Sequence, residues 1–144
     1  MFVKPIRQVK KVFLHCSANS NPNWKINDLK KSHLARGFND IGYHFFIDFN
    51  GTIYKGRDLE IIPSAQKGYN TNSIAICLHG GLNSKNDFKE IQLNKCKELC
   101  LQINSTYNNN ITFHGHCEVE SGKDCPVFDY KKLLNLNQQG YVVL

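Results

Sequence analysis

Apolar residues along this chain of 144 residues form short runs whose lengths and spacings indicate strands that alternate with helices. Residues 9–16 are rich in Val, Phe and Leu, which predicts a first strand that ends at His15. Residues 73–79 (SIAICLH) are almost entirely apolar and predict a central strand buried on both faces. A further strand is expected over residues 111–114.

A β-hairpin is the clearest local prediction. Two β-rich runs, residues 43–49 and 52–55, flank the pair Asn50-Gly51. Both of these turn residues tolerate a positive φ, and the pair is the strongest short-range signal for a hairpin.

Three segments carry apolar residues at helical spacing. Residues 26–37 (INDLKKSHLARG) predict a helix with Asn27 as its cap and Gly37 as its stop signal. Residues 91–107 predict the longest helix, and residues 130–136 a short final one. Because helices are interspersed with strands, we expect an α/β fold: a single domain over residues 1–144, with a central mixed β-sheet flanked by helices.

Composition and charge narrow the possible partners and location. The net charge of +6 predicts attraction to polyanions, but the cations are scattered rather than gathered in a basic arm, so no specific nucleic-acid binding is expected. No run approaches the ~18 apolar residues of a membrane span, so no membrane insertion is expected. Lys4, Arg7 and Lys10 interrupt the apolar stretch that a signal peptide needs, which predicts synthesis in the cytoplasm.

Possible zinc ligands occur in three separate segments: His15 at the end of the first strand, His116 after the late strand, and Cys125 in the loop GKDCP. Zinc favours nitrogen and thiolate ligands in a tetrahedral array, and three protein ligands leave the fourth position to water, as a catalytic site requires. The residues alone leave a simpler alternative open, in which these are a strand-end histidine, a loop histidine and a buried thiol. Spacing alone favours that alternative, because the sequence has no HExxH or paired CxxC motif; the six cysteines are expected to be thiols.

Further sequence segments change this balance. In chain order they are VFLHCSA, GYHFFIDFNGTIYKGRD, KGYNTNSIAICLHGG, HGHCEV and KDCPVFD, and together they span residues 12–129. Jointly they resemble the zinc-dependent N-acetylmuramoyl-L-alanine amidases, a family that includes phage lysozymes of the amidase type and is related to peptidoglycan recognition proteins. The resemblance implies that family's fold, one zinc ion per chain, and hydrolysis of the amide bond between N-acetylmuramic acid and L-alanine in bacterial peptidoglycan.

The resemblance assigns His15, His116 and Cys125 as the zinc ligands. His116 is preferred to the nearby His114 because it directly precedes Cys117, at the start of the matching CEV. The segment between His116 and the following lysine is about one residue longer than is usual in the family.

Two catalytic residues follow from the same resemblance. Tyr43 in GYHF matches a tyrosine beside the zinc-bound water, and Lys123 matches a lysine that faces the substrate carbonyl. A fixed positive charge would stabilise the developing oxyanion, and the tyrosine hydroxyl would hydrogen-bond the attacking water or the intermediate. Without the family context, Tyr43 would be better explained as an aromatic residue of a strand and Lys123 as a solvated charge in a loop.

Substrate contacts are expected from Asn70, Asn72 and His44, although turn geometry explains the asparagines equally well and a strand histidine suits a buried supporting role. Ala65 departs from the family pattern, because many relatives carry a histidine at that position, and this puts the substrate contacts there in doubt.

The expected partner is therefore peptidoglycan, bound by a monomeric enzyme that reaches the wall after the membrane is breached, as phage endolysins do. The main alternative is a non-catalytic peptidoglycan-binding module, which some relatives become after losing the cysteine ligand. The presence of Cys125 with Tyr43 and Lys123 favours the enzyme.

Overall fold

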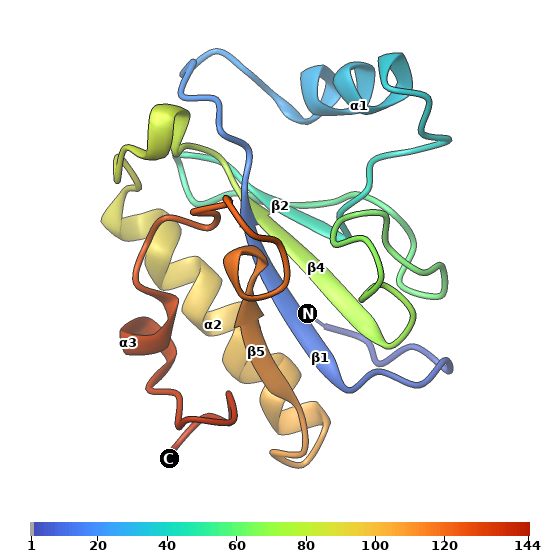
Figure 1. Cartoon of the computed structure of the whole chain (residues 1–144), viewed down its shortest axis with the longest axis vertical. Helices are drawn as coiled ribbons and strands as arrows, with labels where there is room; N and C mark the ends of the chain where they lie inside the picture. Colours follow the sequence, from blue (N-terminus) through green and yellow to red (C-terminus); the bar gives the residue numbers. More distant parts are fainter. Residues whose placement is uncertain (1) are drawn as a thin grey trace.

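The computed structural model describes residues 2–144 and places one five-stranded sheet at the centre of the molecule (Figure 1). The strand order is β3-β2-β4-β1-β5; β2 and β3 are antiparallel, and the other neighbouring pairs are parallel. The expected mixed sheet is confirmed. The strands are β1 (Lys11–Cys16), β2 (Phe45–Ile47), β3 (Ile53–Lys55), β4 (Ser73–Leu78) and β5 (Thr112–Gly115).

Helices cover both faces of this sheet. Helix α2 (Glu90–Thr106) and the short α3 (Tyr130–Leu134) pack on one face, and α1 (Ile26–Ala35) packs on the other. Two short 3₁₀ turns, η1 (Leu82–Ser84) and η2 (His116–Glu118), follow β4 and β5. No helix within residues 2–144 is long and apolar enough to cross a membrane.

Successive side chains along the central strands point to opposite faces of the sheet, which explains how apolar residues fill both faces. In β1, Val12 and Leu14 belong to the core beneath α2, so His15 points to the face that α1 covers. All six residues of β4 are buried, as the apolar run predicted, and β4 lies between β1 and β2. The end of β1 therefore presents a histidine beside β4, which pairs with a strand on each of its edges.

Two local predictions differ from the structure in detail. Helix α1 has Lys25, not Asn27, as its N-cap, because the Asp28 carboxylate accepts a hydrogen bond from the Lys25 backbone N–H at 2.7 Å. The hairpin forms with shorter strands, and only Gly51 of its turn pair adopts a positive φ, 81°. The Asp48 carboxylate accepts hydrogen bonds from two backbone N–H groups of this turn, which stabilises the longer loop.

Candidate active site

A cleft of about 740 Å³ opens at the carboxyl end of β1. It is lined by the turn that follows β1, by the end of α1, by the loop before β4 and by residues between 116 and 127. In sheets with parallel strands, ligands commonly bind at the carboxyl ends of the strands. The cleft is thus where the fold favours a functional site.

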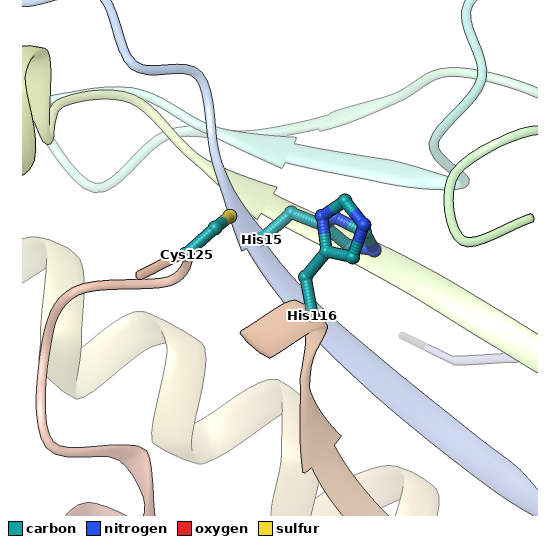
Figure 2. A group of neighbouring side chains, drawn as sticks. All are labelled: His15, His116 and Cys125. Atoms are coloured by element: carbon teal, nitrogen blue, oxygen red, sulfur yellow. The ribbon is translucent and has the colours of Figure 1, made fainter. Parts of the chain in front are cut away.

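The three expected metal ligands meet at this cleft (Figure 2). His15 comes from β1, His116 is the first residue of η2, and Cys125 lies in the loop before α3. One potential ligand atom from each residue lies within 4.8 Å of the other two, and the two imidazole centroids are 4.6 Å apart. Residues separated by more than a hundred positions are therefore brought together by the fold. His114, the alternative to His116 as a ligand, instead forms hydrogen bonds with Glu118 and Thr112.

Hydrogen bonds fix which nitrogen of each histidine is available. The Nε2 of His15 donates to the Oε1 of Gln66 at 2.8 Å, and the Nε2 of His116 donates to the Glu120 carboxylate. Both acceptors lack a proton to give, so each Nε2 carries the hydrogen and each Nδ1 keeps a free lone pair. Carboxylate or carbonyl partners on the far nitrogen are typical of metal-bound histidines.

The protonation states of the two histidines also suit metal binding. Burial and the neighbouring His116 lower the pKa of His15 to about 3, so its imidazole is neutral at physiological pH. Burial also lowers the pKa of His116. A hydrogen bond with Cys16 and burial raise the pKa of the Cys125 thiol, so metal binding must displace a proton there. The Cys16 backbone N–H donates to the Cys125 sulfur at 2.8 Å and helps to hold it in place.

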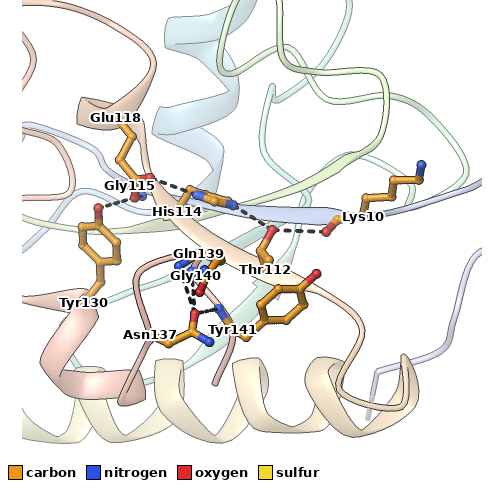
Figure 3. A network of polar contacts seen from close by, with 10 residues as sticks. All are labelled: Lys10, Thr112, His114, Gly115, Glu118, Tyr130, Asn137, Gln139, Gly140 and Tyr141. Atoms are coloured by element: carbon orange, nitrogen blue, oxygen red, sulfur yellow. Dashed lines mark hydrogen bonds and ion pairs between the residues drawn. The ribbon is translucent and has the colours of Figure 1, made fainter. Parts of the chain in front are cut away.

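Glu118 fixes η2, the turn that begins at His116, through the contacts drawn in Figure 3. Its carboxylate accepts hydrogen bonds from the Gly115 backbone N–H and from His114 Nδ1, both at 2.9 Å, and from the Tyr130 hydroxyl. These contacts join η2 to β5 and to α3. The backbone of His116 is thereby held between two elements of the core.

Tyr43 and Lys123 both line the cleft. The Tyr43 ring centroid lies 5.1 Å from that of His15, and burial raises the pKa of Tyr43 well above its usual range, so its hydroxyl stays a donor. The His33 ring of α1 packs at 5.3 Å against Tyr43, and its Nδ1 accepts the Gly42 backbone N–H. Lys123 is exposed at the rim. The site thus combines a neutral donor near the ligands with an exposed positive charge at the rim.

The three expected substrate contacts are placed differently. Asn70 lines the cleft, as does Ala65. Asn72 lines a separate small hollow beside Lys10, because it precedes β4 at the opposite end of the parallel strands. His44 is buried outside the cleft: its Nε2 donates to the Ile61 carbonyl at 2.8 Å and its Nδ1 accepts the Ala75 N–H at 3.1 Å. Of these three residues, the structure brings only Asn70 to the cleft.

Sequence reasoning did not identify Gln66 and Glu120, the residues that orient the two ligand histidines. Gln66 lies in the polar loop PSAQKGYN and nothing in that loop marks it. Glu120 follows its histidine by four residues, in the segment that is longer than is usual, and this was the one available signal. His33 of α1, which no sequence motif marked, also lines the cleft.

Comparison with known proteins decides the family. Residues 5–128 match the family model of N-acetylmuramoyl-L-alanine amidase. The chain belongs to the N-acetylmuramoyl-L-alanine amidase family. It is 34% identical to the endolysin of Enterobacteria phage T3 over 94% of this chain and 91% of that protein. It is 35% identical to the endolysin of Escherichia phage T7 over 88% of this chain and 86% of that protein.

Solved structures agree with this assignment. The amidase LysC of Clostridium intestinale URNW superposes with a TM-score of 0.79 at 26% identity, covering 90% of this chain and 85% of that one. Drosophila PGRP-LB superposes with a TM-score of 0.70 at 27% identity, covering 85% and 76%. The protein is thus a peptidoglycan amidase of the endolysin type, and the expected fold and enzyme class are confirmed.

Proposed function

We propose that this amidase is zinc-dependent and that His15, His116 and Cys125 hold one zinc ion during cleavage of the bond between N-acetylmuramic acid and L-alanine. The observation that carries the proposal is the convergence of these three donors in one cleft. Two neutral imidazole nitrogens and a sulfur are a donor set that suits zinc, and three protein ligands leave one position open. The pre-oriented Nδ1 atoms add a reason to expect a metal there.

The remaining residues of the cleft would act on the substrate. Zinc held by these residues would supply a nucleophilic water at neutral pH and would polarise the scissile carbonyl. Lys123, on a flexible stem at the rim, would bring its ammonium group to the carbonyl oxygen as negative charge develops there. Tyr43, held as a neutral donor, would hydrogen-bond an oxygen of the reacting group from the β2 side.

The charged residues of the cleft suit a stem peptide of peptidoglycan. Arg36, Lys67 and Lys123 line it, together with Glu120 and Asp124. The Glu120 carboxylate is engaged by His116 and the Asp124 carboxylate by the Ser84 hydroxyl, at 2.7 Å. The three cations outnumber these two carboxylates, so the lining keeps a net positive charge that would attract the carboxylates of a stem peptide. As the related phage proteins are endolysins, we propose that this enzyme acts on the wall once the membrane is breached.

The zinc proposal is tested with Cys125→Ser, and with Cys117→Ser as the matched control. Cys117 is also a free thiol, but it is exposed and outside the ligand group. A serine hydroxyl stays protonated at neutral pH and binds zinc poorly. We expect Cys125→Ser to lose stoichiometric zinc and wall lysis yet to remain folded, because the core beneath α2 does not include residue 125.

Three measurements decide the outcome: zinc content by elemental analysis, thermal unfolding, and sedimentation with insoluble cell wall. Cys117→Ser should match the unaltered protein in all three. If Cys125→Ser retained one zinc per chain and normal turnover, the assignment of the ligands would be wrong.

A further inference from the structure

Gln66 is a completely buried polar side chain next to a proposed zinc ligand. Its exposed fraction is 0%, although it lies in a loop between β3 and β4. Its amide makes hydrogen bonds at both ends, with His15 on one side and with the start of β4 on the other. A buried amide with every group engaged has a defined orientation.

The nitrogen end of the Gln66 amide is identified by its partners. It donates to the Ser73 hydroxyl at 2.6 Å and to the Tyr69 carbonyl at 3.3 Å. The Ser73 hydroxyl gives its own hydrogen to the Asn70 carbonyl at 3.0 Å, so it must accept from Gln66. Rotating the amide by 180° would place its oxygen against the Tyr69 carbonyl and leave this bonding pattern broken. The Oε1 of Gln66 therefore faces His15.

From this orientation we propose that Gln66 is a positioning residue that selects the tautomer of His15. The Gln66 oxygen accepts only, so His15 must carry its hydrogen on Nε2 and present the lone pair of Nδ1 to the cleft. The inference rests on the proposed zinc site, because a free Nδ1 is what a metal at that position needs. In the opposite tautomer, the hydrogen on Nδ1 would block the metal.

Asn70 supports this arrangement from within the same loop. Its side-chain oxygen accepts the backbone N–H groups of Ala65 and Gln66, at 3.2 and 3.0 Å. These two bonds close the turn that delivers the Gln66 side chain to His15. Asn70 thus acts on His15 through the loop, in addition to lining the cleft.

Replacing Gln66 removes the only acceptor that the structure gives to His15 Nε2 among residues 2–144. A leucine has similar size but cannot accept a hydrogen bond. The two neutral tautomers of His15 would then lie closer in free energy, and the fraction ready for zinc would fall. Loss of such a partner typically weakens metal binding by about 10- to 100-fold.

The test compares Gln66→Leu and Gln66→Glu with Gln92→Leu as control. Gln92 is also completely buried, and its amide nitrogen donates to the Ile47 and His79 carbonyls at 3.1 and 2.7 Å. It belongs neither to the cleft lining nor to the ligand group. Gln66→Glu gives up the two donated bonds but keeps an acceptor for His15. It therefore separates the positioning role from the stability of the loop.

Two quantities are measured. Nitrogen-15 spectra of the metal-free proteins, labelled at histidine, report which nitrogen of His15 carries hydrogen. Competition with a chromogenic chelator gives the dissociation constant for zinc. We expect a pure Nε2–H form in the unaltered protein, in Gln66→Glu and in Gln92→Leu, and a mixture with about 10- to 100-fold weaker zinc binding in Gln66→Leu.

The unaltered protein alone can overturn the proposal, since an Nδ1–H form of His15 there would contradict it even if every variant failed to fold. Unchanged zinc affinity and tautomer in folded Gln66→Leu would also overturn it. Absence of zinc binding by the unaltered protein would instead count against the proposed zinc site, because the tautomer is read without metal.

Discussion

His44 makes the stability of the domain depend on pH in the acid range. Burial lowers the pKa of His44 from 6.5 to about 4. The Ala75 N–H, which donates to Nδ1, also leaves no room for a second hydrogen on that atom. Below pH 6.5 the unfolded chain binds a proton at this residue and the folded protein does not, so the free energy of unfolding falls as the pH drops toward 4.

The size of this loss in the free energy of unfolding follows from the shift in the pKa of His44. At about 1.4 kcal/mol per pH unit, His44 alone should remove roughly 3 kcal/mol of stability between pH 6.5 and 4. Above pH 6.5 both states are neutral at this residue and it contributes no pH dependence. A loss of this size is a substantial part of the ~5–15 kcal/mol that stabilises a typical domain.

The assay is urea unfolding of the metal-free protein at pH 7.5, 5.5 and 4, compared with His44→Gln. A glutamine can donate to Ile61 and accept from Ala75 but does not titrate, so the difference between the two proteins isolates His44. We expect that difference to shrink or reverse as the pH falls, by roughly 3 kcal/mol in total. A difference that stays constant across the series would refute the reasoning.

Two further predictions concern catalysis. Lys123→Ala and Tyr43→Phe should each retain stoichiometric zinc while kcat falls about 100-fold or more. This is the scale for losing one group that stabilises the transition state. Loss of zinc from either variant would show that a ligand had been taken for a catalytic residue. Mass analysis of digested peptidoglycan should reveal new L-alanine amino termini on stem peptides and uncut glycan strands, whereas new reducing sugar ends without free amines would contradict amide cleavage.

Much of the fold was predictable because its signals are local. The apolar run at residues 73–79 indicated a strand buried on both faces, and β4 is fully buried. The Asn50-Gly51 pair marked a hairpin although only Gly51 takes the special conformation. The resemblance named the ligand residues, while the geometry that joins them required the structure.

The supporting residues were hidden because their roles depend on contacts across the fold. Gln66 touches His15 only because its loop folds back over β1, and no periodicity records that approach. Asn72 and His44 lie within segments that resemble the family, yet neither lines the cleft. The Asn72 carbonyl accepts the backbone N–H groups of Lys10 and of Lys11, the first residue of β1. Lys11 is four residues, or about 13 Å along a strand, before His15.

The sheet itself accounts for the positions of two of the three ligands. Leu14 lies opposite Gly115 in the parallel pairing of β1 with β5, so His15 and His116 are the next residues along each chain. Gly115 is needed there because a Cβ would lie 2.7 Å from the Tyr130 ring. That close approach allows the Tyr130 hydroxyl to reach Glu118, which holds the turn of His116 (Figure 3).

The third ligand depends on a different kind of support. Cys125 belongs to a loop, and the backbone N–H of Cys16, at the end of β1, donates to its sulfur. The loop is thus anchored to the same strand that carries His15. Because all three donors are held through β1, folding of the sheet arranges the site before any metal binds. The metal-free protein should therefore already have the geometry of the ligands, and zinc binding needs only to displace the proton of Cys125.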